Sequence, residues 1–177
     1  MPNLFSQDLK RYGKSSFLKL FFTNPSFRFT VVIRSIKYLN KYNFIRLILV
    51  LYYRKLKVKY GFQIPAMTSI GHGFVINHFG NIIINQGVVI GSNCTVAQGV
   101  TIGKVDRGKL KGNPTIGDRV WIGANSVVVG KITIGNDVLI APLSYVNFDI
   151  PDNAVVMGNP AKIINYNTSA EYIKNIN

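Results

Sequence analysis

Residues 116–146 read IGDRVW IGANSV VVGKIT IGNDVL IAPLSY V, and this stretch decides the fold because it repeats every six residues. Each unit opens on an aliphatic residue, and with two interruptions the same spacing runs back to residue 70. The opening positions are Ile70, Ile76, Ile84, Ile90, Val96, Ile102, Ile116, Ile122, Val128, Ile134, Ile140 and Val146. A fixed short period is typical of a repeat architecture. Because so short a unit cannot bury its own apolar side chain, the units must stack on one another.

The second and fifth positions of the unit are also restricted. The second is often Gly or Ala, and the fifth is often small or aliphatic. A period of six fits neither an α-helix nor a long alternating strand. It fits a short strand and a corner, three of which complete one turn of a triangular coil, and we expect the small residue to let the chain turn tightly. Twelve units therefore predict a parallel β-helix of about four coils.

Two insertions interrupt the period. Two extra residues lie between Ile76 and Ile84, in INHFGNII, and eight lie between Ile102 and Ile116, in GKVDRGKLKGNPT. An extra residue in a ladder re-aims the side chains beside it, so His78 is predicted to leave the regular coil. The second insertion is basic and glycine-rich, which is typical of a solvated loop.

The units IGSNCT, VAQGVT and IGNDVL resemble those of the hexapeptide-repeat acyltransferases, whose fold is a left-handed parallel β-helix. The two insertions and the closing GNPAKII (158–164) resemble the serine acetyltransferase branch of that family. The string NPSFR (24–28), in a short basic N-terminal segment, resembles polysaccharide-modifying members. The resemblance covers roughly residues 61–164. It implies acetyl-CoA as the acyl donor, no metal, and a homotrimer in which each site is shared between neighbouring subunits.

The resemblance also divides the chain: a basic helical segment (1–60), a left-handed β-helix acetyltransferase domain (61–164) and a C-terminal tail (165–177) without an assignable role. The net charge of +14 lies almost wholly in the first segment, which holds thirteen of the 21 Lys and Arg residues and one acid, Asp8. We expect a short helix near 16–22, a helix from Pro25 to about Asn40 capped by Asn24, and a third from Phe44 to about Lys57 capped by Asn43. Residues 1–13 have no clear pattern and are expected to fray.

The basic segment has two interpretations. Its helices pack on the end of the coil and on neighbouring subunits, or they form a basic, aromatic-rich surface that lies on an anionic membrane. The apolar run 47–53 is much shorter than the ~20 residues that a membrane span needs, and no signal peptide precedes it. We therefore expect a cytoplasmic protein, peripheral at the inner face of the membrane in the second interpretation. Charge alone does not indicate nucleic acid, because no recognition motif accompanies it.

Transfer of an acetyl group to a hydroxyl requires a general base within hydrogen-bond reach of that hydroxyl. The chain has two histidines. The position of His78 matches the catalytic histidine that the resemblance implies, whereas His72 is expected at the surface. The one cysteine, Cys94, occupies an inward position and is expected to be a core residue rather than a nucleophile.

The sequence departs from the serine acetyltransferase pattern at three places. Gln63 stands where an aspartate orients the histidine, and Asn77 stands where an aspartate binds the serine ammonium. Gly112-Asn113 replaces the Arg-His pair that binds the serine carboxylate. A zwitterionic acceptor would leave its charged groups without charged partners, which favours a neutral hydroxyl acceptor. Gln63 is expected to orient His78 by hydrogen bonding.

The resemblance implies a groove for acetyl-CoA between adjacent coils of two subunits. Its implied lining comprises Gly103, Lys104, Lys111, Gly123, Ala124, Ala141 and Lys162, where small residues admit the pantetheine arm and lysines meet the phosphates. Trp121 is expected to face outward at a subunit contact.

The sequence thus predicts an acetyl-CoA-dependent O-acetyltransferase acting on a saccharide, in capsule, exopolysaccharide or O-antigen synthesis. Serine O-acetylation in cysteine biosynthesis and a non-catalytic β-helix scaffold remain as alternatives. A metal-dependent β-helix enzyme needs three histidines per site, and the chain has only two.

Overall fold

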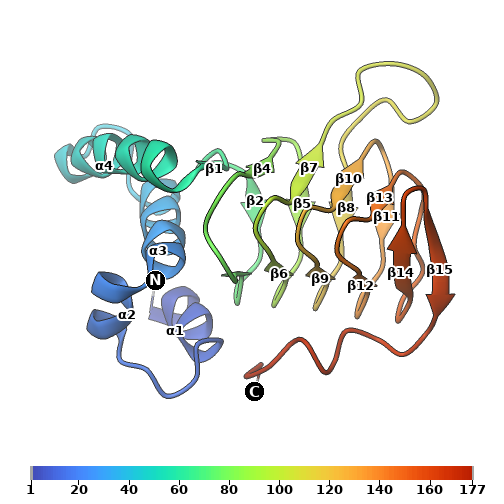
Figure 1. Ribbon diagram of the computed structural model, residues 1–177. Helices are drawn as coiled ribbons and strands as arrows, with labels where there is room; N and C mark the ends of the chain where they lie inside the picture. Colours follow the sequence, from blue (N-terminus) through green and yellow to red (C-terminus); the bar gives the residue numbers. More distant parts are fainter. Residues whose placement is uncertain (1, 177) are drawn as a thin grey trace.

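The computed structural model describes residues 2–176 as a triangular coil of short strands with four helices at one end. Figure 1 shows the helices at the left, the coil extending to the right, and the C-terminal segment returning along the lower side towards the helices. The strands form three faces, and each of the first ten strands pairs with the third strand after it along the chain. This is the architecture that a three-unit turn predicts.

The strands of each face are parallel apart from the last pair. Face A contains β1 (Phe62–Gln63), β4 (Ile82–Ile84), β7 (Thr101–Gly103), β10 (Val127–Val129) and β13 (Tyr145–Val146). Face B contains β2 (Ser69–Ile70), β5 (Val89–Ile90), β8 (Thr115–Ile116) and β11 (Thr133–Ile134). Face C contains β3 (Val75–Ile76), β6 (Thr95–Val96), β9 (Trp121–Ile122), β12 (Leu139–Ile140), β14 (Val155–Gly158) and β15 (Ala161–Asn165). The final pair, β14 and β15, is antiparallel.

Three edges join these faces, and two of them matter for the site. The C–A edge consists of the corners at residues 77–81, 97–100, 123–126 and 141–144. The A–B edge consists of the corners at residues 64–68, 85–88, 104–114 and 130–132. Figure 1 shows the 104–114 loop as the large excursion at the upper right.

The interior of the coil is a column of aliphatic side chains. Ile84 pairs with Ile102, which pairs in turn with Val128, and Val128 pairs with Val146. All four are buried, with at most 1% of the residue exposed. Of the twelve predicted inward residues only Ile70, in the first coil, is not fully buried. Burial of these side chains is the main stabilising contribution to the coil.

The small second-position residues serve a different purpose from the predicted one. Positive φ angles occur instead at the fourth position of the unit, at Asn93, Arg119, Asn125, Asp137 and Leu143. The second-position glycines lie where successive coils approach each other. A Cβ on Gly91, for example, would lie 2.5 Å from the carbonyl oxygen of Gly117. These glycines therefore permit close stacking, and the expectation that they provide the tight turn was wrong.

The coil also continues further than its regular period. Residues 147–158 remain part of it, because Ile150 forms a bridge with Ile134 and is 2% exposed. Val155 and Val156 then pair with Leu139 and Ile140 on face C. A fifth turn thus follows the four complete ones.

The helices are α1 (Pro2–Lys10), α2 (Phe17–Thr23), α3 (Pro25–Tyr38) and α4 (Phe44–Tyr60). The Asn24 side chain accepts a hydrogen bond from the amide of Phe27, and the Asn43 side chain accepts one from Ile45, so both predicted caps are present. Gly61 ends α4 in the left-handed conformation. The prediction that residues 1–13 fray was wrong for residues 2–13, because Asp8 of α1 and Arg11 form hydrogen bonds with Gly73 of the first coil. Met1 lies outside the described residues.

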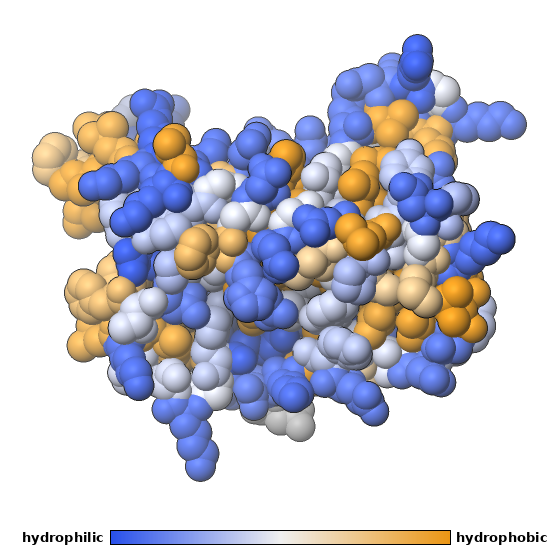
Figure 2. All heavy atoms as spheres, viewed as in Figure 1, coloured by the Kyte–Doolittle hydropathy of each residue, from blue (hydrophilic) through white to orange (hydrophobic). Residues whose placement is uncertain are grey.

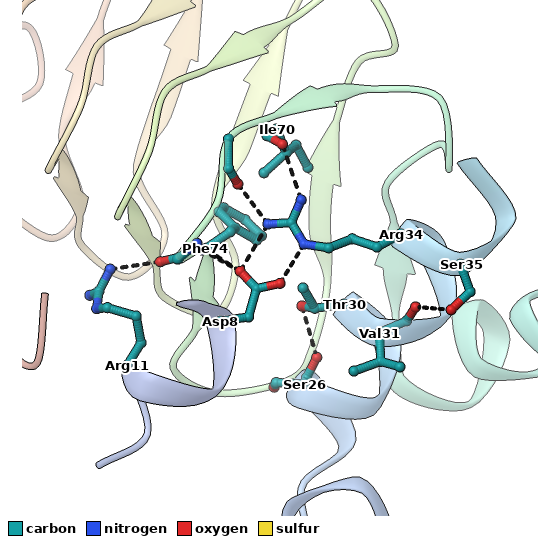
Figure 3. Close-up of polar contacts among 11 residues, drawn as sticks. Asp8, Arg11, Ser26, Thr30, Val31, Arg34, Ser35, Ile70 and Phe74 are labelled. Carbon is teal, nitrogen blue, oxygen red and sulfur yellow. Dashed lines mark hydrogen bonds and ion pairs between the residues drawn. The ribbon is translucent and has the colours of Figure 1, made fainter. Parts of the chain in front are cut away.

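A buried ion pair attaches α1 to the coil (Figure 3). Asp8 is fully buried, pairs with Arg34 of α3, and accepts hydrogen bonds from the amides of Gly73 (2.7 Å) and Phe74 (3.2 Å). Arg34 also donates to the carbonyls of Ile70 and Gly71. Burial raises the pKa of Asp8, while Arg34 and the two amides act in the opposite direction. These hydrogen bonds therefore fix α1 and α3 to the first coil.

The C-terminal tail returns along the coil and reaches α1. Ser169 is fully buried, and its hydroxyl donates to the carbonyl of Arg119. Tyr172 packs on Trp121 with ring centroids 4.7 Å apart. Arg11 donates to the carbonyl of Lys174 at 2.8 Å. The tail thus links the far end of the coil to the segment that follows α1.

Candidate active site

His78 lies on the C–A edge, in the insertion between β3 and β4, where it is exposed to solvent. The insertion carries the chain out of the ladder, as the period predicts, because the residues on either side, Ile76 and Ile82, remain buried. Phe79 packs against Tyr60 of α4 at 5.2 Å between ring centroids. The imidazole is therefore accessible and lies on a segment that the helices support.

His78 borders a hollow of about 280 Å³ between this insertion and the junction of α2 and α3. The lining residues are Thr23, Asn24, Pro25, Ser26, Asn77, His78 and Phe79. Apart from the titratable imidazole, the lining has no charged side chain; it offers hydroxyl, amide and aromatic groups. A ligand that fills this hollow in one subunit would meet neutral hydrogen-bonding partners.

Gln63 and Asn77 differ in their relation to His78. Asn77 shares the hollow. Gln63 is exposed on β1, which pairs with the strand that follows the His78 insertion. Among the described residues no hydrogen bond joins Gln63 to His78. The orienting role of Gln63 thus stays a prediction.

Asn113 belongs to a different edge of the prism. It ends the 104–114 loop on the A–B edge, where its side chain packs so closely over Gly87 that a Cβ there would lie 2.3 Å from Asn113 Nδ2. Its Oδ1 is buried and has no hydrogen-bond partner within the described chain. One subunit therefore does not bring Asn113 and His78 together at a single corner.

The residues implied for acetyl-CoA divide between the same two edges. Gly123, Ala124 and Ala141 lie on the C–A edge, in corners stacked beyond the one that carries His78. Gly103, Lys104 and Lys111 lie at or in the A–B loop, which the pairing of Val105 with Gly112 closes as a hairpin. Lys104 forms an exposed ion pair with Asp106. Lys162 is exposed on β15, at the far end of the coil.

These groups fit a thioester with a long arm and a phosphorylated end. The C–A corners present small side chains; a Cβ on Gly123 would lie 2.5 Å from the backbone nitrogen of Pro142 in the next coil. Exposed lysines at the A–B loop and β15 offer charge to phosphates. Among the described residues no three His, Cys, Asp or Glu side chains gather as metal ligands.

Two residues that were expected at the surface are only partly exposed. His72 lines a pocket with residues of α1 and the tail, and its buried Nδ1 has no hydrogen-bond partner within the described residues. Trp121 faces outward as expected and packs on Tyr172 of the tail, while the expected subunit contact stays a prediction. The partial cover over His72 was missed because α1 and the tail were given no place in the fold.

Cys94 is buried in the coil. Burial raises the pKa of its thiol to about 12, and Sγ donates a hydrogen bond to the carbonyl of Gly117. At neutral pH the group is a protonated thiol and acts as a core side chain.

Sequence reasoning missed the wall of the hollow that α2 and α3 provide. The string NPSFR was interpreted as a helix start, and Asn24 and Pro25 do begin α3. Its second role, beside His78, depends on how α3 packs against β3, and the local pattern carries no signal for that.

Comparison with known proteins supports the interpretation of the repeat. The family described as "Bacterial transferase hexapeptide (six repeats)" matches residues 113–147, and that described as "Hexapeptide repeat of succinyl-transferase" matches residues 81–104. A serine acetyltransferase of Brucella abortus strain S19, solved in complex with Coenzyme A, has the same fold, with a TM-score of 0.78 at 24% identity over 93% of this chain and 68% of that one.

Two relatives bear on function. An Escherichia coli (strain K12) protein, provisionally named colanic acid biosynthesis acetyltransferase WcaB, is 39% identical over 66% of this chain and 71% of its own length. A serine acetyltransferase of Helicobacter pylori (strain ATCC 700392 / 26695) is 36% identical over 59% of this chain. This chain spans 61% of the Helicobacter protein's length. Further similar proteins from Bacillus pumilus (strain SAFR-032) and Arabidopsis thaliana are also named serine acetyltransferases.

The repeat, the coil and these likenesses define a left-handed parallel β-helix of the transferase class, and they confirm the predicted fold. The chain belongs to the hexapeptide-repeat family of bacterial transferases.

Proposed function

We propose that this protein is an acetyl-CoA-dependent O-acetyltransferase in which His78 is the general base. The imidazole accepts the proton of an acceptor hydroxyl while the hydroxyl oxygen attacks the thioester carbonyl. The carbon–sulfur bond then breaks, and the departing thiolate takes the proton from the imidazolium. Support comes from the accessibility of His78, from its place in an insertion that resembles that of the serine acetyltransferase branch, and from relatives that are named acetyltransferases.

The acceptor that we propose is a saccharide hydroxyl. The observation that carries this choice is the hollow beside His78, whose side chains other than the imidazole are neutral. Thr, Asn and Ser side chains suit the many hydroxyls of a sugar, and an aromatic ring such as Phe79 suits its apolar face. The relative assigned to colanic acid biosynthesis agrees with such an acceptor.

Serine is the second candidate acceptor, and the names of the relatives favour it over a sugar. Against it stand Asn77 and Asn113, amides where the serine enzymes have charged groups. The hollow offers no charged partner to the ammonium or the carboxylate of a bound serine, at a cost of about 1–3 kcal/mol for each unpaired group.

The donor site that we propose is shared between two subunits of a homotrimer. His78 and the small corner residues lie on the C–A edge, whereas Asn113 and the basic loop lie on the A–B edge. In a ring of three parallel coils the A–B edge of one subunit can meet the C–A edge of the next, and a heterologous contact of this kind closes after three copies. The unpartnered Oδ1 of Asn113 agrees with a contact from outside its own chain.

The decisive experiment measures thiol release from acetyl-CoA with two series of acceptors. One series contains serine, and the other contains nucleotide-linked and lipid-linked sugars. We expect turnover with sugars, and a loss of at least about a hundredfold in kcat for His78→Ala. His72→Ala is the matched control, because His72 lies against α1 and the tail, outside the hollow.

Each outcome has a distinct meaning. Turnover with serine alone would overturn the saccharide assignment and leave acetyl transfer in place. Turnover unchanged in His78→Ala would overturn the assignment of the base. Absence of acetyl-CoA binding by calorimetry would overturn the enzyme proposal and support a scaffold.

A further inference from the structure

The outer face of α4 is apolar and has no partner within the described chain. Phe44, Leu47, Ile48 and Leu51 recur three or four residues apart and are each more than half exposed (72%, 56%, 51% and 57%). The opposite face packs on the molecule through Leu49, Val50, Tyr53 and Leu56. A stripe of this kind on a folded protein usually marks an interaction surface.

A second apolar group lies on the same end of the molecule. Leu18 and Phe22 of α2 are 68% and 71% exposed. Figure 2 shows two orange areas at the left end of the molecule, where α4 and α2 lie in Figure 1, with blue side chains between and around them. We call this surface, with the stripe on α4, the helical end.

The charges at the helical end are of one sign. Lys41, Arg54, Lys55 and Lys59 are exposed in or next to α4, and Lys19 is exposed on α2. Asp8, the only acid of the first sixty residues, is fully buried in its pair with Arg34. Every exposed charged side chain of residues 5–60 is therefore basic.

Exposed apolar side chains surrounded by basic ones distinguish between two partners for the helical end: a second copy of this protein and an anionic membrane. A second copy meeting the helical end face to face would cover the apolar stripe, but it would place two sets of like charges together without an exposed acid to pair with them. An anionic bilayer accepts apolar side chains into its interface and attracts the surrounding lysines and arginines.

We propose that the helical end docks on an anionic lipid bilayer, with α4 lying in the interface plane. Among the described residues no helix has the length and hydropathy to span a bilayer, so the contact is peripheral. The helical end also lies along the axis of the coil, away from the lateral faces (Figure 1). Parallel coils in a ring would therefore present their helical ends to the same membrane.

Docking would have a consequence for the proposed reaction. The junction of α2 and α3, which walls the hollow at His78, follows directly on the α2 residues Leu18 and Phe22. The hollow would then face acceptors that are themselves held at the membrane. This consequence rests on the proposed function, whereas the docking does not.

The test is flotation of the full-length protein with lipid vesicles, without any assay of activity. Vesicles of phosphatidylglycerol and phosphatidylcholine are compared with vesicles of phosphatidylcholine alone, at low and high salt. We expect binding to the anionic vesicles only, weakened by salt through screening. Leu47→Ser/Leu51→Ser is expected to weaken binding by at least about tenfold.

Matched controls separate this surface from a general effect. Ile164→Ser changes an equally exposed aliphatic residue at the opposite end of the coil, on β15, and is expected to bind as the wild type does. Lys55→Gln/Lys59→Gln is expected to lower binding by about tenfold, and Lys109→Gln, in the distant A–B loop, to leave it unchanged.

Three results would overturn the proposal. The first is failure of the wild type to float with anionic vesicles, and the second is equal binding of Leu47→Ser/Leu51→Ser. The third is concentration-dependent doubling of the assembly that the same double variant abolishes, in the absence of vesicle binding, which would assign the surface to a second copy. Loss of acetyltransferase activity would affect none of these results.

Discussion

Asp8 is the residue whose importance the sequence conceals most completely. It stands in a stretch without hydrophobic period, yet it is fully buried and satisfies Arg34 and two backbone amides. Replacement of one partner of a buried pair leaves the other charge uncompensated, which costs about 3–5 kcal/mol. We therefore expect Asp8→Asn to lower the free energy of unfolding by about 3 kcal/mol, as measured by urea denaturation.

The chain contains a matched control for this substitution. Asp106 pairs with Lys104 in the A–B loop, but its side chain is 79% exposed. Asp106→Asn should leave the free energy of unfolding nearly unchanged, because water replaces the lost partner. Equal effects of the two substitutions would show that the Asp8 pair does not hold α1 to the coil.

Cys94 leads to a prediction about how the stability of the fold depends on pH. Burial holds the pKa of its thiol at about 12 in the folded protein, against about 8.5 in an unfolded chain. The folded pKa is the higher one, so the contribution of this group to stability is complete below about pH 8.5 and is lost as the pH rises towards the folded value. Between pH 8.5 and 10 the loss amounts to about 2 kcal/mol.

The measurement compares the wild type with Cys94→Ser by denaturant unfolding at pH 7.5 and pH 10. Serine occupies equivalent inward positions at Ser126 and Ser144, where its hydroxyl donates to a backbone carbonyl. Other titrating groups cancel in the difference between the two proteins. The wild type should lose more stability than Cys94→Ser; parallel losses would contradict a buried, protonated thiol.

At the scale of elements, the period predicted the coil because each inward residue is set by its own six-residue unit. The last turn of the coil was not predicted because the unit shortens there. Ile150 follows Val146 by four residues rather than six, so the six-residue period is lost although the coils continue to stack. The two predicted helix caps follow the same logic, since an Asn cap acts within three residues. By contrast, α1 and the tail are held by contacts between distant residues, such as Arg11 with the Lys174 carbonyl.

The close stacking of coils yields a prediction for the glycines. A Cβ on Gly91 would meet the Gly117 carbonyl oxygen at 2.5 Å, and backbone cannot move aside cheaply. We expect Gly91→Ala to destabilise the fold by about 2–3 kcal/mol, as overpacking does. Gly103→Ala is the control, because its added Cβ would meet Val129 at an ordinary 3.5 Å. A similar melting temperature for the two variants would refute the stacking requirement.

At the scale of the whole molecule, the exposed position of His78 was predictable from its insertion, whereas the composition of its surroundings was not. Its role as the base stays a prediction. The hollow depends on α2 and α3 folding back beside the first coil. The spacing of the repeats placed Asn113 and His78 in different corners, and the structure puts these corners on two edges of one prism. A site that uses both edges therefore requires a second copy.

This requirement can be tested with mixed assemblies. His78→Ala damages the C–A edge, and deletion of residues 105–111 damages the A–B loop; each variant alone should be inactive. The two are co-expressed with different tags, and assemblies that carry both tags are purified. In a ring of three, every mixed trimer contains one junction between an intact C–A edge and an intact A–B loop, so about one site in three should be active. If each subunit instead built its whole site alone, no mixed trimer would contain an intact site. Absence of thiol release from acetyl-CoA by the mixed trimers, under conditions in which the wild-type protein is active, would therefore reject the shared site.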